Sequence, residues 1–259
     1  MIGRFARRVL GLFALLMLLA GLSGSGVVVG YAQKASPQRA DTTSGPSPLS
    51  PIVVDDFESY ETGRFPEDWV YVSSDKEILS PEEVREPGES ITVRSENDNQ
   101  FLHVNVKNEA IRYSQLNGKD FDWSLREHPR IQWRWRAHHL PEGASEKGKN
   151  DTGAALYVTF GSDWLGRPKS IKYTYSSSLP VGTVVSFGPL KVLVVDSKRE
   201  PHTGEWKTVQ RSLRSDYRQV FGEDPPNRPV SITFWSDSDT TGDYASVDFD
   251  DIELLPPHR

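Results

Sequence analysis

The sequence contains no cysteine among its 259 residues. This absence excludes a disulfide framework, a thiol nucleophile, a thiolate metal site and a lipid-modified amino-terminal cysteine. Basic residues are also in the minority, since 30 Lys and Arg stand against 36 Asp and Glu and give a formal net charge of -6. Nucleic-acid binding favours a basic surface, so we expect no nucleic-acid partner.

Familiar catalytic motifs are absent as well. The sequence has no Gly-x-Ser-x-Gly nucleophile turn, no His-Glu-x-x-His zinc helix and no phosphate-binding glycine loop. Its six histidines form no recognisable catalytic or metal-binding set. His138 and His139 are adjacent, and adjacent side chains of a strand point to opposite faces, so they cannot bind one ion as a simple pair.

One long uncharged run is present, at the amino-terminal end. Arg4, Arg7 and Arg8 precede a stretch from Val9 to Ala32 that carries no charge over 24 residues and ends in small residues. A basic start, an apolar stretch and a small-residue end are typical of a secretory signal peptide, here with cleavage before Gln33. The run is also long enough to span a bilayer if it is not cut. We therefore expect residues 1–32 to be a signal peptide or an N-terminal membrane anchor, and the protein to be exported: periplasmic, secreted or anchored in the inner membrane.

The next segment, residues 33–51, is rich in Pro, Ser, Thr and Gly and has few apolar residues. Such a composition cannot bury enough apolar surface to offset its ordering entropy, which predicts a disordered linker. From residue 52 onward the sequence is rich in aromatic and β-branched residues and supports one folded domain, which we place at 52–255.

Short runs with a two-residue period, separated by turn residues, dominate this domain and predict strands. After the apolar opening at Ile52, we expect strands near 69–73, 90–95, 101–106, 111–116, 131–137, 154–160, 170–176, 183–187, 190–196, 205–213, 230–236 and 245–254. Residues 215–221 are the exception, because a Ser/Asp start, spaced apolar residues and a following glycine indicate one short helix. The pattern predicts an all-β fold: a two-sheet antiparallel β-sandwich, or jelly roll, with one short helix near 215–221.

Several segments of the domain are distinctive as a set: Trp133-Arg-Trp-Arg136, Leu140-Pro-Glu-Gly143, Ser170-Ile-Lys-Tyr173, Gly204-Glu-Trp206, Asp216-Tyr-Arg218 with Phe221-Gly-Glu-Asp-Pro-Pro226, and Ser236-Asp-Ser-Asp-Thr-Thr-Gly242. Together they resemble the bacterial family called Domain of Unknown Function 3047. The opening Asp56-Phe-Glu58 with Trp69, and the closing run Val247 to Leu254, resemble the first and last strands of galactose-binding-like jelly rolls and carbohydrate-binding modules. The resemblance implies an exported β-sandwich, galactose-binding-like or concanavalin-like, with no assigned activity.

The loop after the strand at 230–236 is the first candidate metal site, with Asp237, Asp239, Thr241 and Asp243 as its oxygen ligands. Oxygen ligands at alternate positions and a glycine that permits a sharp turn suit a hard cation such as Ca²⁺. The same residue types also build ordinary polar turns, so a structural Ca²⁺ and a plain turn both remain open.

The two ends of the domain carry further carboxylates: Asp55, Asp56, Glu58, Asp248, Asp250 and Asp251. If the first and last strands are neighbours, as in carbohydrate-binding modules, these groups could share a structural Ca²⁺. The alternative is that they line the solvated face of an edge strand.

Four residues are candidate ligand-binding groups: Arg134, Arg136, Trp164 and Lys172. Arg134 and Arg136 share one face of a strand whose other face carries Trp133 and Trp135. Their two positive charges, about 7 Å apart, repel each other unless an interaction with another group offsets this repulsion. Acidic partners on neighbouring strands would supply this offset structurally, and an anionic or hydroxyl-rich ligand would supply it functionally. Trp164 lies in a turn-like segment and Lys172 alternates with tyrosines, a pattern that suits a sugar site but is also typical of core packing.

We favour an exported, non-catalytic binding or envelope-associated module, with a glycan as the first ligand class to test. One alternative is a carbohydrate-active hydrolase that uses Asp248, Asp250 and Glu253, which faintly resemble the Glu-x-Asp-x-x-Glu strand of laminarinase-type glycosidases. Another is a structural domain that binds a protein partner. A carboxylate pair about 5–10 Å apart at the floor of a cleft would favour the hydrolase, whereas a shallow surface of aromatic and arginine side chains would favour binding.

Overall fold

The structure is a computed structural model that describes residues 49–258, apart from 74–76, 85–87, 149–150 and 201–203. The predicted signal peptide or anchor, and the predicted linker as far as residue 48, therefore lie outside the described residues. Within the described residues, no helix combines the length and the apolar character needed to cross a membrane.

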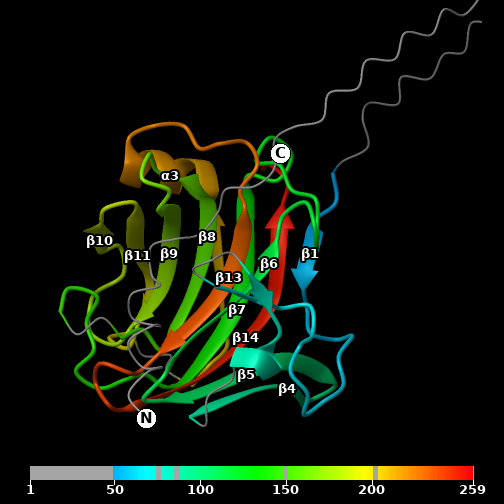
Figure 1. The fold of residues 1–259 in the computed structure, drawn as a ribbon, viewed down its shortest axis with the longest axis vertical. Coiled ribbons are helices and arrows are strands. Elements are labelled where there is room, and N and C mark those ends of the chain that lie inside the picture. The colour runs from blue at the N-terminus through cyan, green and yellow to red at the C-terminus, as the bar shows by residue number, and fades with distance from the viewer. Residues whose placement is uncertain (1–48, 74–76, 85–87, 149–150, 201–203, 259) are drawn as a thin grey trace, which may run out of the picture.

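Two six-stranded sheets make up most of the described part of the chain, beside one small two-stranded sheet (Figure 1). The β7–β14 sheet has the order β12 (Lys207–Ser212), β7 (Arg130–His139), β14 (Tyr244–Leu255), β5 (Asn99–Lys107) and β4 (Glu89–Glu96), and β1 (Ile52–Asp55) also pairs with β14. The β8–β13 sheet has the order β10 (Val184–Phe187), β11 (Leu190–Ser197), β9 (Pro168–Ser176), β8 (Ala154–Ser162), β13 (Ser231–Asp237) and β6 (Ala110–Leu116). All of these pairs are antiparallel except β9 with β11, which is parallel.

The predicted all-β sandwich with one short helix is confirmed. That helix is α3 (Leu213–Phe221), and it ends at Gly222, whose left-handed backbone (φ 75°) lets its N–H bond the carbonyl of Arg218 at 2.9 Å. Three small elements accompany it: β2 (Tyr71–Val72), which falls within the predicted run 69–73, β3 (Ile78–Leu79) and α2 (Pro81–Val84). Neither β3 nor α2 was predicted, because two to four residues are too few to show a hydrophobic period.

The strand β7 shows why the two sheets pack together. Ile131, Trp133, Trp135 and Ala137 alternate along β7 and are fully buried between the sheets. The Trp133 ring lies 5.5 Å from Tyr173, and Trp135 lies 5.6 Å from Tyr175, both on β9 of the facing sheet. The opposite side chains of β7 therefore point outward, away from the core.

Two β-bulges interrupt the pairing of β7 with β14. Ser246 pairs with His139 and Val247 with Ala137, so His138 is an extra residue in β7. Further along, the pairing passes from Asp250 with Arg134 to Glu253 with Gln132, and Asp251 adopts φ 46° between them. A bulge bends the strand and redirects side chains, and both bulges lie next to the outward charged residues of the sheet.

Candidate functional site

The outward side chains of three neighbouring strands form one surface, which we call the charged face. Its members are Arg134, Arg136 and His138 from β7, Asp248 and Asp250 from β14, Phe101 and His103 from β5, and Trp206 just before β12. In the strand register, Asp248 lies opposite both Arg136 and His103, and Asp250 lies opposite Arg134. Carboxylates of the central strand are thus flanked by cationic or imidazole side chains.

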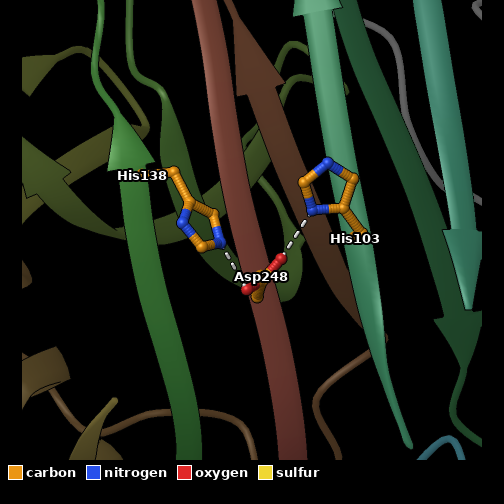
Figure 2. Close-up of side chains that lie close together, drawn as sticks. All are labelled: His103, His138 and Asp248. Carbon is orange, nitrogen blue, oxygen red and sulfur yellow. Dashed lines mark hydrogen bonds and ion pairs between the residues drawn. The ribbon is translucent and has the colours of Figure 1, made fainter. Parts of the chain in front are cut away.

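Asp248 is the centre of this surface, as Figure 2 shows for three of its residues. Its carboxylate is fully buried and lies 2.7 Å from His103 Nδ1 and 2.7 Å from His138 Nε2. Arg136 Nε donates a third hydrogen bond at 2.8 Å. Burial alone would raise the pKa of Asp248, but the three hydrogen bonds outweigh burial and hold the pKa below its usual value.

The two arginines each hold a second acidic group. Arg136 Nη1 lies 2.9 Å from Glu96, and Arg134 Nη1 lies 2.9 Å from Asp251 and 3.4 Å from Asp250. Burial raises the pKa of Asp250 to about 6, although a hydrogen bond from Asn99 opposes the rise. If the charges of Arg134 and Arg136 are offset within the protein, acidic side chains must lie on neighbouring strands. The structure places such side chains on β14.

Trp206 adds an aromatic platform to the charged face. Its ring centroid lies 4.8 Å from the guanidinium carbon of Arg134 and 4.6 Å from that of Arg136, which is cation–π geometry. Phe101 meets the same ring edge-on at 5.4 Å. The Trp206 side chain is half-buried, so part of it is available to solvent.

The other two predicted ligand-binding residues lie elsewhere. Trp164 is 88% exposed in the turn between β8 and β9. Lys172 is buried on β9, where its ammonium lies 5.4 Å from the rings of both Tyr157 and Trp235. The structure thus brings Arg134 and Arg136 together but does not place Trp164 or Lys172 with them.

The four predicted metal ligands in the loop 237–243 each have separate partners. Asp237 is buried and accepts hydrogen bonds from the Thr152 N–H and from Trp235 Nε1. The Thr241 hydroxyl donates to Asp151, and Asp239 is exposed. Asp243 lies 2.9 Å from His139 Nε2. These contacts fix the loop by hydrogen bonds between protein groups, and the calcium prediction stays untested.

Asp237 has an unusual environment. Burial raises its pKa to about 7, and the positive charge of Lys172 opposes that rise. Sequence reasoning placed Asp237 and Lys172 in different candidate sites, but both lie in the β8–β13 sheet and interact electrostatically.

The carboxylates at the two chain ends have mostly separate hydrogen-bond partners, although the charge of Asp56 acts on Glu253, and the shared calcium site stays a prediction. The strand β1 pairs with β14, as the proposed shared site requires. However, Asp55 accepts hydrogen bonds from Trp69 Nε1 at 2.6 Å and from the Phe57 N–H at 2.8 Å, whereas Asp248 and Asp250 bind groups of the charged face. Glu253, the third member of the predicted hydrolase trio, lies beyond the second bulge and 3.3 Å from Gln132 Nε2.

A different set of residues has metal-binding spacing. Among the described residues, one group of at least three His, Asp or Glu side chains could hold an ion: His103, His138 and Asp248, whose ligand atoms all lie within 4.8 Å of one another. Sequence reasoning missed this group and also Trp206. His103 and Asp248 are 145 positions apart, and no local pattern reveals which residues face each other across a sheet.

Comparisons with known proteins give one family and several similar folds. The model of the family described as "Protein of unknown function (DUF3047)" matches residues 80–253. A search of curated proteins found no significant match.

Among solved structures, a family 11 carbohydrate-binding module of the cellulosomal cellulase Lic26A-Cel5E of Clostridium thermocellum is 12% identical with a TM-score of 0.42, over 82% of this chain and 97% of that one. A family 30 carbohydrate-binding module of the cellulase Cel9D-Cel44B, also of Clostridium thermocellum, is 14% identical with a TM-score of 0.41, over 82% and 100%. The xyloglucanase domain of NopAA from Sinorhizobium fredii is 11% identical with a TM-score of 0.39, over 67% and 90%. At these identities and TM-scores, the similarity gives no information on the function of this chain.

Proposed function

The chain belongs to the DUF3047 family of proteins of unknown function, and from the geometry of its charged face we propose that it is a non-catalytic module that binds a glycan. Sugar rings bind proteins through the faces of aromatic side chains and through charged groups that hydrogen-bond the hydroxyls. The charged face supplies both kinds of group on neighbouring strands. All of them except Trp206, which immediately precedes β12, lie on strands, so binding needs little ordering of the protein.

The single observation that carries this proposal is the position of Trp206. Its half-buried ring lies over two arginines whose planar guanidinium groups carry several N–H donors. The buried carboxylates of Asp248 and Asp250 lie on the adjacent strand and hold the two arginines in place. This combination of a partly exposed aromatic ring and arginine side chains supports a binding module.

The carboxylates of the charged face give less support to hydrolysis. A general acid must carry a proton at the working pH and reach the substrate. The lowered pKa of Asp248 disfavours that role, and Asp250, whose pKa is raised to about 6, has a fully buried side chain. Tyr60, Arg64 and Pro81 are among the residues that line a pocket of about 820 Å³. Neither Asp248 nor Asp250 is part of its lining. The carboxylate pair therefore does not lie at the floor of this pocket.

We also propose that the protein acts outside the cytoplasm, in the periplasm or as a secreted protein. The support is the basic start, the uncharged run and the small-residue end of residues 1–32. A glycan or another cell-envelope component is then the first class of partner to test.

The experiment is a screen of the purified protein against glycans and cell-wall fragments, repeated with Trp206→Ala and Trp164→Ala. Trp164 is the matched control, because it is an exposed tryptophan on the other sheet. Loss of a central aromatic contact costs about 2 kcal/mol or more, roughly a 30-fold loss of affinity. We expect this loss for Trp206→Ala and none for Trp164→Ala. Equal binding by both variants and the unaltered protein would refute the charged face as the glycan site.

A further inference from the structure

The side chains of His103, Asp248 and His138 converge from three neighbouring strands (Figure 2). The strand register places His103 directly opposite Asp248. His138 is the extra residue of the first bulge in β7, and the bulge turns its ring toward the same carboxylate. Each imidazole nitrogen lies 2.7 Å from a different oxygen of Asp248. The Asp248 carboxylate therefore lies between the two imidazole rings, within hydrogen-bond distance of both.

We propose that His103, His138 and Asp248 bind a divalent transition-metal ion such as Zn²⁺, Ni²⁺ or Cu²⁺. Two imidazole nitrogens and one carboxylate oxygen form a ligand set that favours these ions over Ca²⁺ or Mg²⁺, which prefer oxygen ligands alone. The ligand atoms all lie within 4.8 Å of one another, so small movements of the side chains bring them to bonding distance.

The surroundings suit a metal site that is built in advance and open on one side. His103 and Asp248 are buried, whereas 41% of the His138 side chain is exposed and gives an ion access from solvent. An ion held by three protein ligands keeps a coordination position free for water or an exogenous ligand.

Arg136 is the feature that opposes a cation, because its Nε donates to Asp248. Glu96 lies 2.9 Å from Arg136 Nη1 and offsets its charge. A carboxylate has about four lone-pair sites, so Arg136 can keep its hydrogen bond while Asp248 also binds an ion. In that arrangement Arg136 fixes the orientation of the carboxylate, as outer-sphere partners of metal ligands do.

The test is a titration of the metal-stripped, untagged protein with ZnCl₂ and NiCl₂ by calorimetry, with CaCl₂ as the comparison. It needs no glycan, so its outcome is independent of the proposed function. His138→Gln removes an exposed ligand, and His139→Gln is the matched control, because His139 is adjacent but contacts Asp243 instead. We expect binding of Zn²⁺ or Ni²⁺ that weakens about tenfold or more in His138→Gln and is unchanged in His139→Gln.

A spectroscopic measurement keeps the proposal falsifiable even where a variant changes stability. Paramagnetic resonance of the Cu²⁺ complex should show coupling to two imidazole nitrogens in the unaltered protein and to one in His138→Gln. Absence of zinc, nickel and copper binding would overturn the proposal. Equal weakening by His138→Gln and His139→Gln, or an unchanged nitrogen coupling in His138→Gln, would do so too.

Discussion

At the scale of single residues, the alternation of side chains along a strand predicts the direction in which each side chain points but not the residues that surround it. The pattern around Trp133 correctly predicted that Arg134 and Arg136 point away from the core. It could not show that Lys172 is buried between Tyr157 and Trp235, because an outward side chain of one strand can be covered by others. The His103 and Asp248 contact escaped prediction for a similar reason, since it depends on strand register.

The two arginines should differ in their contribution to stability. Arg136 binds the fully buried Asp248 at 2.8 Å, whereas Arg134 lies 2.9 Å from the partly exposed Asp251 and reaches the buried Asp250 only at 3.4 Å. Breaking a buried ion pair costs about 3–5 kcal/mol, and a surface pair contributes about 0–1 kcal/mol. Because two histidines still bind Asp248, we expect Arg136→Gln to cost about 2–3 kcal/mol and Arg134→Gln less than about 1 kcal/mol.

Urea denaturation of both single variants and the double variant measures this difference. A double variant that is as stable as the unaltered protein would show that the acidic partners do not need the arginines. If that variant also keeps glycan binding, neither the structural nor the ligand-binding role of the pair survives.

Asp237 makes a testable contribution to the pH dependence of stability. Burial raises its folded pKa from 3.8 to about 7, so between these values the folded state binds a proton that the unfolded state has lost. The free energy of unfolding must then fall as pH rises from about 4 to 7, through this group. Asp237→Asn removes the titration, so the stability of the variant relative to the unaltered protein should rise across that range.

Denaturation midpoints at several pH values between 4 and 8 measure this slope. Asp237→Asn also removes the attraction to Lys172. This loss shifts the free energy of unfolding of the variant by a similar amount at every pH and does not restore its dependence on pH. Parallel curves for the two proteins would show that Asp237 titrates normally in the folded state. Asp239→Asn is the control, because Asp239 is exposed in the same loop.

At the scale of elements, strands were predictable and their irregularities were not. Two-residue periods and short apolar runs located β4 to β14, although burial alternates only in strands such as β4 and β7 and covers both faces of β13. The bulges of β7 and β14 are invisible in such a pattern, since each arises from a mismatch between two strands distant in sequence. The bulge in β7 positions His138 for the proposed metal site. The sequence pattern could therefore not predict a feature on which that site depends.

The second bulge contains a strained residue whose cost can be isolated. Asp251 has φ 46°, a left-handed conformation that costs a residue with a Cβ atom about 1–2 kcal/mol. Asp251→Gly and Asp251→Ala both remove the contact with Arg134 and differ by one methyl group. We therefore expect the glycine variant to be more stable than the alanine variant by about 1 kcal/mol in urea denaturation.

The opposite order, with alanine equal or superior, would mean that the bulge relaxes once the Asp251 carboxylate is gone. The carboxylate of Asp251, and not the pairing of the strands, would then be what holds this conformation.

At the scale of the whole molecule, the sandwich follows from the number of short strands and from the apolar side chains that they bury between two sheets. The neighbouring positions of β1 and β14 were anticipated only through the resemblance to carbohydrate-binding modules, and the structure shows that pairing. The parallel pairing of β9 with β11 could not be read from the sequence, because alternation along a strand carries no information on the direction of its neighbour.

Export through residues 1–32 would determine where the mature chain begins. A signal peptide is removed after translocation, so the exported protein should begin at Gln33. All described strands lie between Ile52 and Leu255, so cleavage before Gln33 removes none of them, and a chain that starts there should melt at the same temperature as the uncleaved protein. Mass spectrometry of material recovered outside the cytoplasm distinguishes this mature chain from an intact, membrane-anchored one. Recovery of the intact chain as a freely soluble cytoplasmic protein would contradict both forms of export, and the glycan of the cell envelope would then lose its place as the first ligand to test.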